Sequence, residues 1–492
     1  MIEFVIGGIV LLLGLIYFRS ERRAVDNLPP GPPGLPVVGN LLQLGRTPPF
    51  KRFMEWRKTY GDTFLIHMGS RFPMVVMHDY DTIKKVLNDE VTTGRDQRFV
   101  FVKDFAGKGL IFTQGDLWKE QRRFAISTLR DFGMGKTWLE DNIIAEVEDM
   151  CGMLRKLNRQ PFDPKTLLSH SVSNVICALV FGKRFDHSDA KFGKLSTLFA
   201  ENIRVIGPVL AVVQAFPILR FVPGPFRRAV KVARRNFGDL YAFCKQLINE
   251  HQSKFSSESA DDYIDAYLKE AQEQKRKGIV DSTFSEQQLI ISVLNLFAAG
   301  TETTSTTTLW ALVFLLENPD VMHKMQKEID DNIPHDRSIR MEDKGLLPYT
   351  EAAILEIQRC ASLVPLGVFH QTLADTVIDG YNVPKGTLLA ANLYSVHHDP
   401  RYWKNPTAFD PNHFLDADGK VVHPAAGFAP FEVGKRSCLG EALAKMELHL
   451  FIANIVKNFN LENEPGKRVS HENFVSSFVL GPSPCKLVFV PR

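Results

Sequence analysis

The sequence has few cysteines, and none of them forms a recognisable metal or redox pair. Its 492 residues include six cysteines, with no C-x-x-C pair and no short Cys/His cluster at zinc spacing. A structural zinc is therefore not indicated, and this cysteine usage suits a reducing compartment. One of the six, Cys438, lies in "FEVGKRSCLG" close to an arginine and two glycines, whereas a packing cysteine normally has apolar neighbours.

The chain also lacks a strong charge bias and any repeat or low-complexity block. Its formal net charge is only +3, which gives no reason to expect nucleic-acid binding. With 45% hydrophobic and 23% charged residues, the disordered and fibrous classes are excluded. The 36 phenylalanines outnumber the 10 tyrosines, which suits a Phe-rich core and equally an apolar pocket.

Only one long uncharged apolar run is present, Phe4–Phe18, close to the ~20 residues that a membrane span needs. Glu3 precedes it and arginines follow it, the reverse of the order in a cleavable signal peptide. We interpret residues 1–20 as an uncleaved anchor with the rest of the chain in the cytosol; a cleaved signal is the alternative. Residues 21–40, basic and then rich in proline, predict a stiff hinge.

Beyond residue 40, helical patterns dominate, and strand-like runs such as "RFPMVVMH" and "CKLVFV" are short. The polar stretch Lys254–Gly278 is interpreted as a solvated surface segment rather than a linker. The sequence therefore predicts one large domain, residues 41–492, that is mainly α with a small β part.

The residues around Cys438 form the pattern F-x-x-G-x-R-x-C-x-G, which comprises Phe431, Gly434, Arg436, Cys438 and Gly440. Apolar positions at helical spacing follow, so the cysteine lies at a helix N-terminus, where free N–H groups and the helix dipole favour a thiolate. The glycines let a flat cofactor approach the backbone, and the arginine can bind a carboxylate. A thiolate in this setting suits haem ligation, with a free thiol at a helix cap as the alternative.

This pattern resembles the haem-binding loop of the cytochrome P-450 superfamily. The anchor, the proline-rich hinge and three further motifs appear in that family's order and cover nearly the whole chain. The resemblance is to the animal microsomal group that oxidises drugs, fatty acids and steroids. It implies the cytochrome P-450 fold, with haem b between a long central helix and the helix after the cysteine, and with Cys438 as axial ligand.

The second motif lies in a predicted long helix between Ser285 and Pro319. Ser285 with Gln288 forms a capping-box signature, and about 30 helical residues would extend about 45 Å. The helix contains Ala299–Thr304, which resembles the family's oxygen-activation groove.

In that groove, Gly300 is expected to loosen the helix, and threonine hydroxyls that bond to the preceding turn can bend it. The resemblance implies that Thr303 faces the oxygen and that Glu302 helps to relay protons. Most of the other threonines between 301 and 308 are interpreted as core hydroxyls that bond back to the helix.

The third motif is Glu356-x-x-Arg359, which an ordinary solvated ion pair could also explain. In the family it is a buried structural pair completed by an arginine farther along the chain. Here His413 stands at that position, so the third partner is expected to be weaker or more hydrated.

The fourth motif, Trp118 and Arg122, places an indole and a guanidinium four residues apart on one helix face. Both could reach a haem propionate, and the resemblance adds Arg95, His370 and Arg436 as propionate partners. Phe431 of the cysteine loop is also expected to contact the haem.

The resemblance also implies the location of the substrate pocket. A Phe-rich segment between Arg95 and Trp118 would form a lid, and such a site is mostly apolar. The pocket residues implied are Phe105, Phe112, Asn295, Ala299, Val364, Leu366 and Phe478. Separately, Phe216–Arg235 mixes aromatic and basic residues and suits either a second membrane contact or an ordinary surface loop and helix.

These features together predict a monooxygenase anchored in the endoplasmic reticulum membrane. It would insert one oxygen atom from O2 into an apolar organic substrate, with electrons from NADPH through a flavoprotein reductase and cytochrome b5 as an optional partner. The residues expected at the reductase face are Lys119, Arg123, Lys435 and Lys445. The alternatives are an isomerase on the same fold that needs no reductase, and a haem carrier or gas sensor without turnover.

Overall fold

The computed structural model describes residues 26–492 except 36, 70–72, 98–106, 133–136, 188, 190–191, 194–196, 200, 203–211, 214–215, 256–259 and 425. The predicted anchor, residues 1–20, and Phe105 of the predicted lid lie outside the described residues. Among the helices of the described ranges, none combines the length and the apolar character that crossing a bilayer requires.

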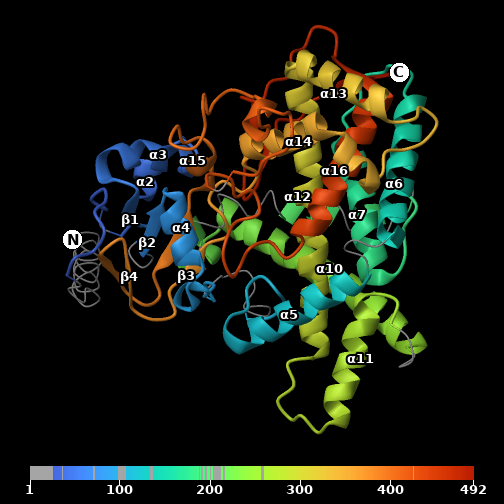
Figure 1. Cartoon of the computed structure of the whole chain (residues 1–492). Helices are drawn as coiled ribbons and strands as arrows, with labels where there is room; N and C mark the ends of the chain where they lie inside the picture. The colour runs from blue at the N-terminus through green and yellow to red at the C-terminus, as the bar shows by residue number, and fades with distance from the viewer. Residues whose placement is uncertain are drawn as a thin grey trace.

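Helices make up most of the molecule and surround the long helix α12 (Figure 1). The α-helices are α2 (Leu41–Leu44), α3 (Pro49–Tyr60), α4 (Tyr80–Leu87), α5 (Gly115–Phe132), α6 (Thr137–Lys156), α7 (Lys165–Phe181), α10 (Pro225–Lys254), α11 (Tyr263–Arg276), α12 (Glu286–Glu317), α13 (Pro319–Asn332), α14 (Pro348–Ala361), α15 (Leu393–His397) and α16 (Glu441–Asn458). Short 3-10 helices are η1 (Glu90–Thr92), η3 (Pro217–Arg220), η4 (Met341–Leu346) and η5 (Pro411–Phe414).

The β part is small and lies mainly at one side of the molecule (Figure 1). Its strands are β1 (Thr63–His67), β2 (Pro73–Met77), β3 (His370–Gln371), β4 (Thr376–Ile378), β5 (Tyr381–Val383), β6 (Leu388–Ala391), β7 (Phe459–Asn463), β8 (Phe474–Ser476), β9 (Leu480–Pro482) and β10 (Leu487–Pro491). The main sheet has the order β1-β2-β6-β3, with β2 and β6 parallel and the other pairs antiparallel. Strands β2 and β10 coincide with the two strand-like runs of the sequence.

The described part of the proline-rich hinge lies against the sheet. The Leu65 N–H donates to the Pro30 carbonyl at 2.8 Å, and the Asn382 N–H donates to the Asn27 carbonyl at 2.9 Å. A side-chain carbon on Gly31 would lie 1.9 Å from the Leu65 carbonyl oxygen, so only glycine lets this strap reach β1. Asn27 and Pro30 therefore hold this part of the chain against the β4–β5 pair and β1, respectively.

Helix α12 follows the boundaries that its sequence predicts. The Ser285 hydroxyl accepts the Gln288 N–H at 3.2 Å, and Pro319 opens α13 immediately after α12 ends. Its 32 residues extend about 48 Å and pass through the middle of the molecule (Figure 1). The capping box is only half formed, because the Gln288 side chain turns away from Ser285 and bonds to Gly109.

Gly300 has a packing role that the sequence pattern did not predict. Helix α12 is continuous through this residue. A side-chain carbon on Gly300 would lie 2.4 Å from Ile176 Cδ1 of α7, so its absence lets the two helices pack closely. The sequence pattern did not reveal this contact, because Ile176 lies on a different predicted helix.

The segment Lys254–Gly278 is not wholly a solvated segment, as the sequence interpretation had it. It contains α11, which Asp262 caps by accepting the Asp265 N–H at 2.9 Å. Tyr263, Ile264 and Tyr267 on this helix are buried. Most other residues of α11 are polar and partly or fully exposed, so a helix with one buried stripe had the composition of a surface segment.

Candidate functional site

The loop before α16 holds Cys438 in a fixed backbone geometry. The Cys438 N–H donates to the Phe431 carbonyl at 2.9 Å, and the Ser437 N–H donates to the Gly434 carbonyl at 3.1 Å. Gly434 has a φ of +87°, and a side-chain carbon there would lie 2.3 Å from the Leu87 carbonyl oxygen. The glycine of the motif is thus required by backbone conformation and by the close approach of α4.

Cys438 retains accessible surface just before the N-terminus of α16, as its pattern predicts. Even so, desolvation by the surrounding protein raises the pKa of its thiol, while the Gly440 N–H and Arg122 oppose this effect. The helix terminus acts in the predicted direction, because the Gly440 N–H lowers the pKa of the thiol, but desolvation outweighs it. A bound metal cation has to supply the missing stabilisation, since coordination deprotonates a thiol outright.

Three guanidinium groups gather beside this loop, as the haem-propionate prediction requires. Arg95 donates from Nη1 to the Val368 and Phe369 carbonyls at 2.9 Å each. Arg122 donates to the Ser437 carbonyl at 2.7 Å. Arg436 donates from Nε to the Thr93 carbonyl at 3.0 Å and lies 3.8 Å over the Trp118 ring, a cation–π contact. Trp118 thus orients Arg436, a role that the sequence did not reveal.

The cluster carries an excess of buried positive charge. Burial lowers the pKa of Arg95 to about 10, and burial together with Arg95 and Arg122 lowers the pKa of Arg436. The nearest acid, Glu432, has a carboxylate oxygen 3.6 Å from His370 Nε2. Arg95 Nε and His370 Nε2 are buried and have no hydrogen-bond partner among the described residues. The guanidinium groups of this cluster fit an anion such as a pair of carboxylates.

His370 is oriented by its other ring nitrogen. Its Nδ1 lies 2.8 Å from the Thr92 carbonyl oxygen, which can only accept, so the proton is on Nδ1. Burial lowers the pKa of His370, and Arg95 lowers it further. The imidazole is therefore neutral near pH 7 with Nε2 as an acceptor, and it must gain a proton before it can donate to an anion.

The groove residues of α12 are arranged as follows. The Thr303 hydroxyl donates to the Ala299 carbonyl at 2.6 Å, the back-bond expected of a helix threonine. The Glu302 carboxylate lies 3.5 Å from the Thr306 hydroxyl, and burial raises its pKa. Glu302 therefore keeps a proton to higher pH than an exposed glutamate does.

Glu356 and Arg359 form a buried bidentate pair on α14. Arg359 donates to the two Glu356 oxygens at 2.7 and 2.6 Å, and both side chains are fully buried. Arg359 also donates to the carbonyl oxygens of His397, Pro406 and Ala408 and to Cys360 Sγ. His413 Nδ1 lies 3.1 Å from Glu356, so the histidine does occupy the third position of the motif.

The predicted pocket residues that the structure describes differ in their exposure and contacts. Ala299 is exposed although most of α12 is buried, and Phe112 and Val364 are partly buried. Leu366 packs against the sheet core, and Phe478 is 48% exposed in the turn between β8 and β9. Asn295 differs from the others, because its side-chain oxygen accepts two backbone N–H groups.

Comparison with known proteins decides which family this arrangement belongs to. A cytochrome P450 family model matches residues 29–489. The chain belongs to the cytochrome P450 family. The fold predicted from the sequence, mainly α with a small β part, is confirmed.

Among similar proteins, rabbit (Oryctolagus cuniculus) cytochrome P450 2B4 is 41% identical over 461 residues, which cover 93% of this chain and 91% of the relative. Human (Homo sapiens) cytochrome P450 2C8 is 39% identical, with 98% and 97% covered. Pig (Sus scrofa) vitamin D(3) 25-hydroxylase is 38% identical, with 98% and 96% covered. This P450 is therefore a monooxygenase that uses a haem held by a cysteine thiolate.

Two acidic residues of the P450 site region were missed by the sequence analysis. Glu432 lies inside the cysteine motif at a position that the pattern leaves variable, and it has a φ of +61°. Glu447 is fully buried on α16 beside Thr304, and burial raises its pKa to about 8. A charged residue within the apolar run "KMELHLF" was the available signal for Glu447.

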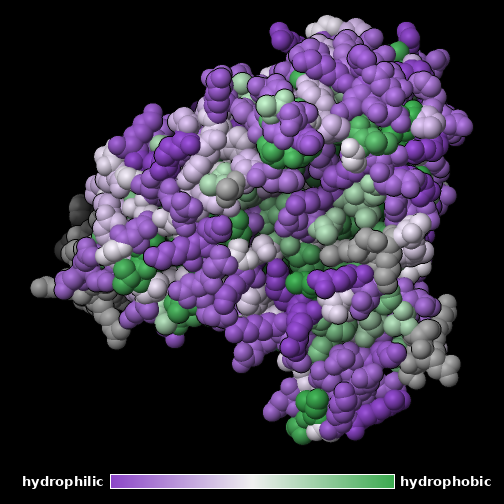
Figure 2. Space-filling view, viewed as in Figure 1, coloured by the Kyte–Doolittle hydropathy of each residue, from purple (hydrophilic) through white to green (hydrophobic). Residues whose placement is uncertain are grey.

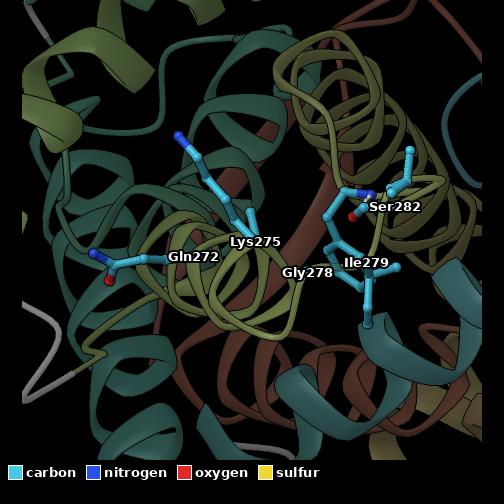
Figure 3. A pocket seen from close by; sticks show the side chains of 8 residues that line it. Gln272, Lys275, Gly278, Ile279 and Ser282 are labelled. Atoms are coloured by element: carbon cyan, nitrogen blue, oxygen red, sulfur yellow. Dashed lines mark hydrogen bonds between the residues drawn. The ribbon is translucent and has the colours of Figure 1, made fainter.

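A surface pocket of about 600 Å³ lies elsewhere, where α11 ends (Figure 3). Lys275 is its one charged lining residue, and the Ser282 hydroxyl donates to Gln274 at 2.7 Å. It contains none of the predicted site residues. Its lining residues are Ala271, Gln272, Lys275, Gly278, Ile279, Val280, Ser282 and Phe284.

Proposed function

We propose that this P450 is a membrane-anchored monooxygenase that inserts one oxygen atom from O2 into an apolar organic substrate. Its electrons would come from NADPH through a flavoprotein reductase, with cytochrome b5 as an optional donor. The observation that carries the proposal is the cluster of Arg95, Arg122 and Arg436 beside the Cys438 loop, in which Arg95 and Arg436 are buried. A metal-binding sulfur next to an anion site is the donor set that haem and its two propionates require.

In this proposal Cys438 would be the thiolate ligand of the haem iron, and bound haem would supply the activation of O2. Arg95, Arg122 and Arg436 would neutralise the propionates, with His370 as a further contact and Trp118 stacked on Arg436. Phe431 shares the cysteine loop and would pack against the haem. Positive groups that are held in place before binding need no reorganisation when the anion arrives.

Thr303 and Glu302 are proposed to hold protons for the reaction. Thr303 Oγ1 carries a hydroxyl proton that the Ala299 carbonyl orients, and the raised pKa of Glu302 lets its carboxyl store a proton. A buried apolar site offers few other donors, so placed groups of this kind control proton supply.

The substrate class is proposed from the apolar lining. Phe112, Ala299, Val364, Leu366 and Phe478 bear no group that could fix a strongly polar ligand. The name of the pig relative, vitamin D(3) 25-hydroxylase, supports a steroid-like or similarly apolar substrate.

Membrane contact is proposed at two places, the predicted anchor and the segment Phe216–Arg235. Ile218 and Phe221 are 66% and 62% exposed in and just after η3. Exposed basic residues follow on α10: Arg227, Arg228, Lys231, Arg234 and Arg235. Apolar side chains beside a basic helix face suit the surface of the endoplasmic reticulum membrane, with the catalytic domain in the cytosol. Figure 2 shows that most of the visible surface is hydrophilic, apart from scattered hydrophobic patches.

Two measurements test this function. The reduced protein with carbon monoxide should show the long-wavelength Soret band of thiolate-ligated haem, and Cys438→His and Cys438→Ala should lose it. Reconstitution with reductase should give substrate-dependent NADPH consumption and an oxygenated product. A band that survives Cys438→Ala would refute the ligand assignment.

The same reconstitution distinguishes the two alternative functions, an isomerase and a haem carrier or sensor. Product formed from a peroxide substrate without NADPH would indicate an isomerase. Haem binding without any turnover in a broad screen of apolar compounds would indicate a carrier or sensor.

A further inference from the structure

The backbone segment Gly109–Gln114 is the part of the predicted lid that directly precedes α5, and it is held from two sides. Helix α12 bonds it on one side, through the side chains of Gln288 and Asn295. The basic cluster bonds it on the other, through Arg436 and the backbone of Arg95. We call Gly109–Gln114 the bridge segment.

Gln288 uses both ends of its side-chain amide on one residue of the bridge segment. Its Oε1 accepts the Gly109 N–H at 3.0 Å, and its Nε2 donates to the Gly109 carbonyl at 3.0 Å. The side chain is buried, with only 2% of Gln288 exposed. A buried amide that makes both bonds stabilises one backbone position, and losing either bond leaves a desolvated group without a partner.

Asn295 uses a single atom on the next two residues. Its Oδ1 accepts the Leu110 N–H at 2.9 Å and the Ile111 N–H at 3.1 Å. Gly109 permits this approach, since it has a φ of +79° and a side-chain carbon there would lie 2.5 Å from Asn295 Oδ1. The bonds therefore require an acceptor at Oδ1, whereas neither of them uses the amide nitrogen.

The far end of the bridge segment meets the propionate cluster. The Thr113 carbonyl accepts from Arg436 Nη2, and the Gln114 side chain accepts the Arg95 N–H at 3.3 Å. The Thr113 hydroxyl donates back to the Gly109 carbonyl at 3.0 Å, which couples the two ends. Between them, the Phe112 carbonyl accepts from Gln97 at 2.6 Å.

We infer that Gln288 and Asn295 are positioning residues that fix the bridge segment and so set where a substrate lies in the pocket. Asn295 acts through the Leu110 and Ile111 backbone, not by touching the substrate as a pocket residue. The inference rests on the proposed location of the substrate beside Phe112 and Ala299.

The decisive comparison is Asn295→Asp against Asn295→Leu. Aspartate keeps an acceptor at the Oδ1 position, and leucine keeps the volume but removes it. Asn295→Leu should change the ratio of products from an apolar substrate with two oxidisable positions, and Asn295→Asp should restore the wild-type ratio. Hydrogen exchange at the Leu110 and Ile111 amides should become about tenfold faster in the leucine variant, because each amide loses one hydrogen bond. A tenfold change corresponds to about 1.4 kcal/mol.

Gln288→Met supplies an independent arm, because the hydrogen bonds described for the Gln288 side chain go to the bridge segment and to Ser292, and its backbone bond to Ser285 survives the substitution. It should shift the product ratio in the same direction as Asn295→Leu while the carbon monoxide band stays intact. If Gln288→Met does not fold, the Asn295 pair still decides the question.

Two results would overturn the inference. One is an Asn295→Asp variant that behaves like Asn295→Leu, because the side-chain nitrogen would then matter as a direct substrate contact. The other is faster exchange at Leu110 with an unchanged product ratio, because the segment would then be loosened without effect on the substrate. If wild-type protein gave no product with reductase, the proposed function would fail instead. Dissociation constants of apolar ligands, measured from haem spectral shifts in both Asn295 variants, would still test the positioning role.

Discussion

His413 stands where the family resemblance leads one to expect an arginine, and its two hydrogen bonds explain how the motif keeps its charge. Nδ1 lies 3.1 Å from the Glu356 carboxylate, and Nε2 faces the Lys404 carbonyl oxygen. Both partners are acceptors, whereas a neutral imidazole has only one N–H. The protonated ring alone satisfies both bonds, so this position carries a cation that pH can remove.

A pH dependence follows that an arginine would not show. The hydrogen bond to Glu356 raises the pKa of His413 above its usual 6.5, although burial and Arg359 oppose the shift. A raised pKa in the folded state means that the stabilisation is complete below pH 6.5 and is lost as pH rises through the higher folded value. Thermal unfolding of His413→Arg and wild type should agree at pH 6 and differ by on the order of 1 kcal/mol at pH 9.

The other groups near this histidine do not explain such a difference. Glu356 stays ionised because Arg359 and His413 lower its pKa, and the Trp403 ring near His413 does not titrate. Parallel pH profiles for the two proteins would show that folding does not raise the pKa of His413.

Thr303 can be tested against a neighbour of the same type on the same helix. Thr303→Ala should keep haem, substrate binding and electron uptake, but should consume NADPH while releasing hydrogen peroxide in place of product. Thr307 donates to the Thr303 carbonyl at 2.9 Å and is 5% exposed, so Thr307→Ala should cost only modest stability. Equal product yield per NADPH in the two variants would refute the proposed role of Thr303 in proton delivery.

At the level of helices and strands, local signals in the sequence located most elements. Ser285 and Pro319 mark the ends of α12, and the runs around Val75 and Val488 are strands. The cysteine motif likewise predicted its loop and helix, because its glycines and arginine act within a few residues of Cys438. These features are determined by neighbours in the chain, so a single sequence contains them.

The remaining site contacts were not predictable, because their partners are far apart in the chain. Asn295 bonds to residues 184 and 185 positions away, and Gly300 packs against Ile176. Neither residue type says which distant segment it meets. The family resemblance placed Asn295 in the substrate pocket, and the sequence alone could not add its bonds to Leu110 and Ile111 or the contact of Gly300 with Ile176.

The contact between α7 and α12 gives a prediction whose sign depends on a second residue. Gly300→Ala should destabilise the P450 by about 1–3 kcal/mol, because the new methyl overlaps Ile176 Cδ1. In an Ile176→Ala background the same change should stabilise it by about 1 kcal/mol, since alanine is the better helix former. Denaturant unfolding of the four proteins forms a double-mutant cycle, and additive effects would mean that the helices do not touch there.

For the molecule as a whole, the proposed reductase face is partly neutralised by its own acids. Glu90 contacts Lys435 and bonds Lys119 at 2.9 Å, and Glu441 bonds Lys445 at 2.7 Å. All of these side chains are substantially exposed, so the pairs add little stability and act mainly on the field that a partner meets.

Reversing Lys435 and Lys445 to glutamate should slow reduction by the reductase and leave substrate binding unchanged. Glu90→Gln is the opposite change, because it releases two lysines, and it should speed reduction at low ionic strength. Stopped-flow reduction at several salt concentrations measures both, and the differences should shrink as salt screens the charges. If these substitutions left the rate of reduction at low salt unchanged, the reductase would have to dock on another face.

The strap at residues 26–40 has a practical consequence for measuring how the enzyme sits on a bilayer. Because Asn27 and Pro30 bond to the sheet, a dye attached at Asp26 would turn with the globule instead of reporting its own tumbling. Polarised fluorescence from this dye, with the protein on a supported bilayer, would then report the tilt of the catalytic domain relative to the membrane. Replacing Gly31 by valine should detach the strap from β1 and lower the fluorescence anisotropy of the dye. This variant therefore serves as the control for a dye that moves independently of the domain.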